Sequence, residues 1–124
     1  MNQAMAKARA TIGEFVEGLD HPSQTQSSVA LKVRVEEGQA VEHLWLVSVT
    51  HTADSFTGLV NDQPLNLPNV RLGQSVSVPL DRVSDWLAVD QGHLIGGYTI
   101  RLLRSRMDAK ERQQYDAQLG AVIE

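Results

Sequence analysis

Residue types that take part in hydrolytic catalysis gather in one stretch, residues 84–101, which reads SDWLAVDQGHLIGGYTIR. Ser84, Asp85 and His93 are the residue types of a serine hydrolase triad. Neighbouring side chains on a strand point to opposite faces, so Ser84 and Asp85 are poorly placed to act on each other. No G-x-S-x-G nucleophile elbow occurs. Hydrolysis by this triad is therefore disfavoured. A small enzyme with a site formed across the fold near Asp85, His93 and Arg101 stays open as an alternative.

The four histidines do not predict a metal site. A zinc site needs several ligands at about 2 Å from one ion. His43 and His51 are eight residues apart, which is about 26 Å along an unbroken strand. They cannot share an ion there, so we expect no metal, and nothing else in the sequence indicates a cofactor.

The segment IGGYT contains the adjacent pair Gly96 and Gly97. It matches neither a phosphate loop nor a dinucleotide fingerprint, because no helix start is expected after it. The structural interpretation is a bulge or a close approach, with Trp86 lying over the glycines and Asp85 paired with Arg101. The functional interpretation is the floor of a cleft that a peptide or ligand could occupy.

If this stretch does bind something, the binding residues share one property: all lie in the corner made by residues 85–101. They are Asp85, Trp86, His93, Gly96, Gly97, Tyr98 and Arg101.

Composition excludes several classes of function. The chain has 124 residues, a net charge of −4 and no cysteine, which removes disulfides, thiolate metal sites and cysteine nucleophiles. A negative net charge argues against nucleic-acid binding, and no stretch is long and apolar enough to span a membrane. Residues 1–20 contain no signal-peptide pattern, so we expect a cytoplasmic location, although a leader removed beforehand would leave no trace.

The positive charge is uneven along the chain. Five of the eleven lysines and arginines fall within twelve residues: Arg101, Arg104, Arg106, Lys110 and Arg112. The simplest interpretation is a solvated strand end followed by a helix start.

The elements that must position these residues follow from hydrophobic periodicity. Apolar residues at spacings of three and four predict an amphipathic helix over residues 3–19. A second helix is expected over residues 108–122, because Asp108 and Glu111 form a capping pattern. The β-rich segment between them is predicted to contain strands at 29–36, 42–50, 55–61, 75–80 and 98–104, a loop at 61–74 and either a helical turn or a strand at 81–92.

These elements predict a single α+β domain over residues 1–124. Its curved, mostly antiparallel sheet has five or six strands and is flanked by N- and C-terminal helices; a small, partly open barrel is the alternative closure. The most apolar strand carries Trp45, which we expect to be largely buried. Trp86 is expected to be half exposed with its indole N–H bonded.

Three segments together resemble a bacterial family, domain of unknown function (DUF) 2314. They are EHLWLVSV, FTGLVNDQPLNLPNVRLGQSVSVP and VSDWLAVDQGHLIGGYTIRLL, and the similarity covers residues 28–107. The matching positions are Glu42, His43, Trp45, Gly58, Asn61, Pro64, Asp85, Trp86, Gly96, Gly97, Tyr98, Thr99 and Arg101. The resemblance supports the β-rich core as a fold unit and implies no catalytic residues.

The most favoured functional hypothesis is a non-catalytic protein-interaction module. An immunity or regulatory protein that binds a bacterial toxin or enzyme is its most concrete form, and an acidic surface would suit a basic partner. The alternatives are the small enzyme and a domain that binds a small molecule or peptide. The sequence leaves the oligomeric state open.

Overall fold

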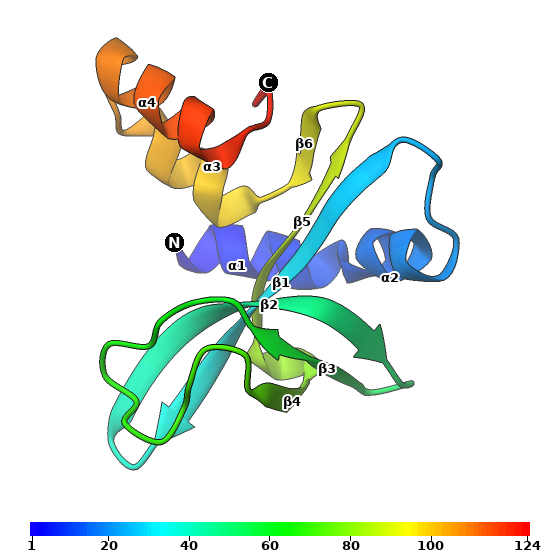
Figure 1. Cartoon of the computed structure of the whole chain (residues 1–124), viewed down its shortest axis with the longest axis vertical. Helices are drawn as coiled ribbons and strands as arrows, with labels where there is room; N and C mark the ends of the chain where they lie inside the picture. Colours follow the sequence, from blue (N-terminus) through cyan, green and yellow to red (C-terminus); the bar gives the residue numbers. More distant parts are fainter.

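Six strands form one antiparallel sheet with the order β4-β3-β2-β1-β5-β6. The computed structural model describes residues 1–124, and Figure 1 shows α1 and α2 crossing the sheet while α3 and α4 lie beside β6. The sheet is not closed, because β4 and β6 are its two edges. The elements are α1 (Asn2–Ala10), α2 (Ile12–Asp20), β1 (Gln26–Glu37), β2 (Ala40–His51), β3 (Ser55–Val60), β4 (Ser75–Pro79), the 3-10 turn η1 (Leu80–Arg82), β5 (Val83–Asp90), β6 (His93–Gly96), α3 (Tyr98–Ser105) and α4 (Ala109–Leu119). The α+β prediction is confirmed, with an open sheet in place of a barrel.

The main core lies between the sheet and the two N-terminal helices. Leu31 and Val33 of β1 pair with Leu46 and Leu44 of β2, and all four side chains are at most 1% exposed. Because side chains alternate along a strand, these residues share one face. Phe15 of α2 packs into the same cluster, so the amphipathic N-terminal segment covers this face.

The N-terminal helix is broken in the middle, which corrects the prediction of one helix over residues 3–19. The break falls at Thr11, between α1 and α2. The Thr11 hydroxyl donates to the carbonyl of Lys7 (2.9 Å) and accepts from the indole N–H of Trp86 (3.0 Å). A threonine that bonds back to the preceding turn bends a helix, and here the bend is held by the core tryptophan.

A second, smaller core lies on the opposite face of the sheet. It joins β5 and β6 to α3 and to the end of the chain, through Leu87, Val89, Leu94, Ile100, Ala121 and Ile123. Trp45 packs only against the margin of this cluster and is half-buried. The expected burial of Trp45 was therefore wrong, because its strand is central but its side chain points to the face that is covered only in part.

The tryptophan of the main core is Trp86, which is 1% exposed. Its indole N–H bond was predicted correctly, whereas the expectation that the ring is half exposed was wrong. In β5, Trp86 points toward α1 and α2, and its ring packs against Phe15 with the centroids 6.0 Å apart.

Residues 98–104 form the helix α3, which corrects the prediction of a strand there. Gly96 and Gly97 both adopt left-handed backbone conformations, with φ of 71° and 64°, and they turn the chain out of β6. The sequence YTIRLLR is rich in aromatic and β-branched residues, which favour strands. That local preference is overridden because a buried carboxylate holds the first turn of the helix, as described below.

The long loop at residues 61–74 is fixed by two carboxylates of the β1–β2 hairpin. Glu42 accepts hydrogen bonds from the backbone N–H groups of Leu65 (3.0 Å) and Asn66 (2.8 Å). Glu37 accepts one from Asn69 (2.9 Å). Leu67 between these anchors is 3% exposed and joins the main core, so the loop is part of the packed domain.

The C-terminal helix begins as the sequence predicts. Asp108 and Glu111 form a complete capping box. The helix ends at Gly120, which closes it in a left-handed conformation with φ of 73°. None of the helices is long and apolar enough to cross a membrane.

Candidate functional site

Asp85 holds the start of α3. Its carboxylate accepts hydrogen bonds from the backbone N–H groups of Trp86 (2.8 Å), Tyr98 (3.0 Å) and Thr99 (2.9 Å), and from the Thr99 hydroxyl (2.5 Å). The residue at the helix N-cap, Gly97, has no side chain that could do this. A carboxylate at a helix N-terminus satisfies orphan N–H groups and complements the helix dipole. Asp85 is completely buried, so it acts as a cap supplied by a neighbouring strand.

Gly96 lies directly against Trp86. A Cβ at Gly96 would be 2.6 Å from the carbonyl oxygen of Trp86 and 2.8 Å from its ring. The N–H of Gly97 donates to the same carbonyl (2.6 Å). The prediction that the tryptophan approaches the glycines closely is confirmed for Gly96. For Gly97, a Cβ would instead meet the side chain of Leu94, at 2.9 Å.

Arg101 ties α3 to β6 and to the end of the chain. Its guanidinium donates to the carbonyl oxygens of Gly96 (2.7 Å), Leu94 (2.7 Å) and Glu124 (2.9 Å). The expected ion pair between Asp85 and Arg101 is not formed: Asp85 already accepts three hydrogen bonds from the start of α3 and one from the N–H of Trp86. Arg101 is therefore held by three main-chain oxygens, one of them at Glu124, and it forms no ion pair with an Asp or Glu side chain.

His93 and Arg101 both contact Glu124, His93 at the side-chain carboxylate and Arg101 at the main-chain oxygen. His93 is exposed at the start of β6. Asp85 is enclosed in the interior and Arg101 is held by carbonyl groups, so the structure does not bring Asp85, His93 and Arg101 together around one cavity. Its geometry offers no support for an active site built from these three side chains.

The structure brings together a different pair that the sequence analysis missed. His43 Nδ1 lies 2.5 Å from Ser84 Oγ, because β1 places β2 and β5 on its two sides and Ser84 falls where the β1–β5 register shifts. Burial, and then the nearby Lys32 and Arg34, lower the pKa of His43, which favours a neutral imidazole. No carboxylate orients the second ring nitrogen, so the pair lacks the third member of a triad. The two residues are 41 positions apart, and no local pattern links them.

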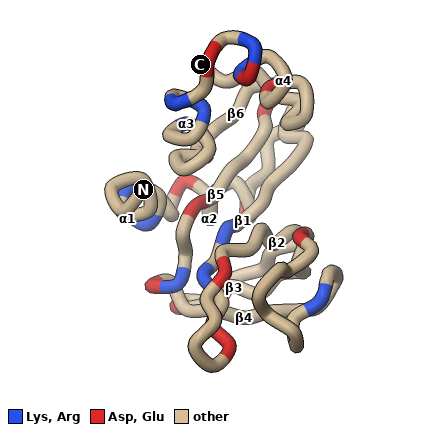
Figure 2. The backbone as a smooth tube through the Cα atoms, turned by 90° about the vertical axis from the view of Figure 1, so that its left-hand side faces the viewer, with Lys and Arg blue, Asp and Glu red and all other residues tan.

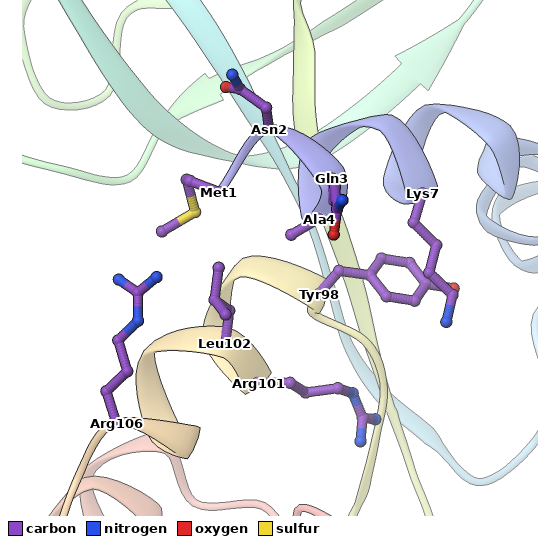
Figure 3. Close-up of a pocket in the computed structure, with 9 residues that line it drawn as sticks. All are labelled: Met1, Asn2, Gln3, Ala4, Lys7, Tyr98, Arg101, Leu102 and Arg106. Atoms are coloured by element: carbon purple, nitrogen blue, oxygen red, sulfur yellow. The ribbon is translucent and has the colours of Figure 1, made fainter.

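The largest groove lies beside the corner, between α1 and α3 (Figure 3). Its volume is about 720 Å³, and its lining includes Lys7 of α1, Tyr98, Arg101 and Leu102 of α3, and Arg106 directly after α3. The Lys7 ammonium lies 5.3 Å from the centroid of the Tyr98 ring, a cation–π contact. No Asp or Glu lines the groove. Of the predicted binding residues, Tyr98 and Arg101 contribute to it.

No three histidine, aspartate or glutamate side chains lie together in a way that could hold a metal ion. Every buried side-chain nitrogen and oxygen has a hydrogen-bond partner. The polar residues of the corner thus serve internal contacts, and the groove beside them is the largest cavity open to a ligand or partner.

Fold and site together define a small α+β domain with an open sheet, a corner locked by a buried aspartate and a cationic groove beside it. The chain belongs to the DUF2314 family, described as uncharacterized proteins conserved in bacteria, which it matches over residues 1–122. The resemblance seen in residues 28–107 therefore extends over both flanking helical segments.

Two relatives are similar to this chain. A protein of Neisseria meningitidis serogroup B, named "Putative ankyrin repeat protein", is 39% identical over 85 residues, which are 68% of this chain and 34% of that protein. The chain thus spans about a third of the length of this relative. The uncharacterized protein YegJ of Escherichia coli K12 is 28% identical over 119 residues, covering 96% of this chain and 76% of YegJ. No solved structure matches the chain.

Proposed function

We propose that this chain is a protein-interaction module that does not catalyse a reaction. The observation that supports this most is the saturation of the corner. The Asp85 carboxylate accepts three hydrogen bonds from the start of α3 and one from Trp86, and the Arg101 guanidinium donates to three main-chain oxygens. An active site needs polar groups that converge on a cleft and are free to act on a substrate, and these groups are already occupied.

The Neisseria relative gives further support. Its name refers to ankyrin repeats, which stack into extended concave binding surfaces. Similarity over about a third of such a protein favours a role in protein binding over catalysis. An immunity or regulatory protein that binds a bacterial toxin or enzyme in the cytoplasm is the most concrete form of the proposal.

The test is to recover and rebuild the complex. The tagged chain is used to capture proteins from the native host under several growth conditions, and a captured protein is then produced separately and mixed with the purified chain. We expect one protein to co-elute with the chain at a fixed stoichiometry in size-exclusion chromatography. If no protein reconstitutes, while a metabolite raises the melting temperature in a thermal-shift screen, the domain binds a small molecule and the proposal is wrong.

A further inference from the structure

The cationic side chains that line the α1–α3 groove form no ion pair with an acidic side chain, and no Asp or Glu lines the groove. Arg34, Arg82 and Arg104 each form an ion pair with an acidic side chain elsewhere on the molecule. The three cationic side chains of the groove, Lys7, Arg101 and Arg106, form none. Figure 2 shows basic positions of α1 and α3 on the same side of the molecule. The groove is therefore a local cationic surface on a chain whose net charge is −4.

The cations are spread along the groove. In Figure 3, Arg106 lies at the end near Met1, and Lys7 lies at the end near Tyr98. Between them lie the apolar side chains of Leu102 and Ala4, together with the polar side chain of Gln3. A compact anion such as phosphate is bound by donors that converge on one point. Separated cations beside apolar side chains instead suit a partner segment that carries several carboxylates together with apolar side chains.

The dimensions of the groove agree with this kind of occupant. Helical residues rise about 1.5 Å each, so the stretch from Met1 to Lys7 is about 9 Å long and the stretch from Tyr98 to Arg106 is about 12 Å. These lengths correspond to about two turns of a docked helix. The volume of about 720 Å³ would admit a few of its side chains but not a folded domain.

We infer that the groove between α1 and α3 binds an acidic, amphipathic segment of a partner protein. This rests on the proposed function and specifies the chemistry of the partner. The net charge of the whole chain suggested a basic partner, but the local charge of the groove has the opposite sign. Charge complementarity of this kind speeds association and selects among partners.

The experiment is an NMR titration of the isotope-labelled chain with a twelve-residue peptide of glutamate and leucine, with leucines spaced for one helix face. Two matched peptides, with glutamine or lysine in place of glutamate, serve as controls. We expect shift changes to cluster on the amides of α1 and α3 with the glutamate peptide only. Its affinity should fall as salt rises, because exposed charges are screened.

Charge-reversal variants locate the contact. Lys7→Glu and Arg106→Glu should each weaken the glutamate peptide by about tenfold, since each removes one attraction and adds one repulsion. Lys110→Glu on α4 and Arg71→Glu in the 61–74 loop make the same change outside the groove. These two controls should bind the peptide within about twofold of the parent. The variants change exposed side chains, and far-ultraviolet circular dichroism confirms that each is folded.

Three results would overturn the inference: no binding of the glutamate peptide at millimolar concentration, equal weakening by all four variants, or equally tight binding of a DNA duplex. The last two would mean that the surface attracts any polyanion. The reconstituted complex separates this failure from that of the proposed function. If the natural partner still binds Lys7→Glu and Arg106→Glu as tightly as the parent, the groove assignment alone is wrong, whereas the absence of any complex removes both.

Discussion

The corner of β5, β6 and α3 and the groove between α1 and α3 share Tyr98 and Arg101, yet their chemistry differs. In the corner, a buried carboxylate and a guanidinium are saturated by backbone groups, and a tryptophan fills the space above a glycine. In the groove, the side chains of Lys7 and Arg106 are exposed, and no Asp or Glu is among the lining residues. Rare residues that stand out in a sequence can therefore serve the fold, while the groove for which we propose a binding role is lined by ordinary lysine and arginine.

The largest effect is expected from Trp86, the tryptophan of the corner, compared with Trp45 outside it. Trp86→Ala should lower the free energy of unfolding by about 3–5 kcal/mol, the range for truncating a buried aromatic residue, because Trp86 lies at the centre of the main core. Trp45→Ala should cost clearly less, because Trp45 is half-buried at the margin of the second core. Urea unfolding of both variants measures the difference. Equal losses in the free energy of unfolding would contradict the unequal burial of the two tryptophans.

The glycines of the corner should rank next. Gly96→Ala introduces a Cβ in a left-handed conformation, which costs about 1–2 kcal/mol, and forces it against the carbonyl and ring of Trp86, which adds about 1–3 kcal/mol of overpacking. Gly97→Ala meets only the flexible end of Leu94 and should cost less. Thermal melts of both variants test this order, and a Gly96→Ala variant as stable as the parent would show that the corner is not tightly packed.

The smallest effects should come from pH, with opposite signs at two histidines. The hydrogen bond that the His51 ring donates to the Asp20 carboxylate raises the pKa of His51. The stabilisation from this pair is therefore complete below the ordinary value of 6.5 and is lost as pH rises through the folded pKa. Burial lowers the pKa of His43, so stability falls as pH drops below 6.5, where only the unfolded chain readily takes up the proton.

The His51 effect should be at most about 1 kcal/mol, since its pair with Asp20 is solvent-exposed. The free energy of unfolding should therefore be measured between pH 5 and 8. Its dependence on pH should change in Asp20→Asn, through loss of the His51 contribution, and should change in the opposite sense in His43→Gln. If neither substitution alters the pH dependence, the two histidine environments are misassigned.

Much of the fold could be predicted because local patterns agree with the final structure. Alternation along β1, the capping box at Asp108 and the loop at residues 61–74 all follow from periodicity and cap chemistry. Residues 98–104 could not be assigned correctly, because their strand-like composition is overruled by Asp85, which is brought to the helix start only by the pairing of β5 with β6.

The site was predicted in part for the same reason. The approach of Trp86 to Gly96 was predicted, because glycines within a strand often mark a place where another group comes close to the backbone. The sequence analysis predicted Trp45 as the buried ring, and the structure buries Trp86 instead. Which of the two is buried depends on the face of the sheet that the N-terminal helices cover. The α1–α3 groove depends on a helix that the sequence did not predict, so its cations were interpreted as a solvated strand end.

We propose that the corner of β5, β6 and α3 supports the fold and that the α1–α3 groove binds an acidic segment of a partner. The most direct measurement is the melting temperature of the parent, Asp85→Asn and Arg106→Glu, each with and without the glutamate–leucine peptide. Asp85→Asn leaves buried N–H donors unpaired, at about 1–3 kcal/mol each. For a domain of this size, that should lower the melting temperature by roughly 3–6 °C per kcal/mol.

Peptide at ten times its Kd should stabilise the parent and Asp85→Asn alike, by about 1.4 kcal/mol. Arg106→Glu should melt like the parent without peptide and gain much less from the same peptide concentration. The account is contradicted if Asp85→Asn melts like the parent, or if Arg106→Glu gains as much from the peptide as the parent does.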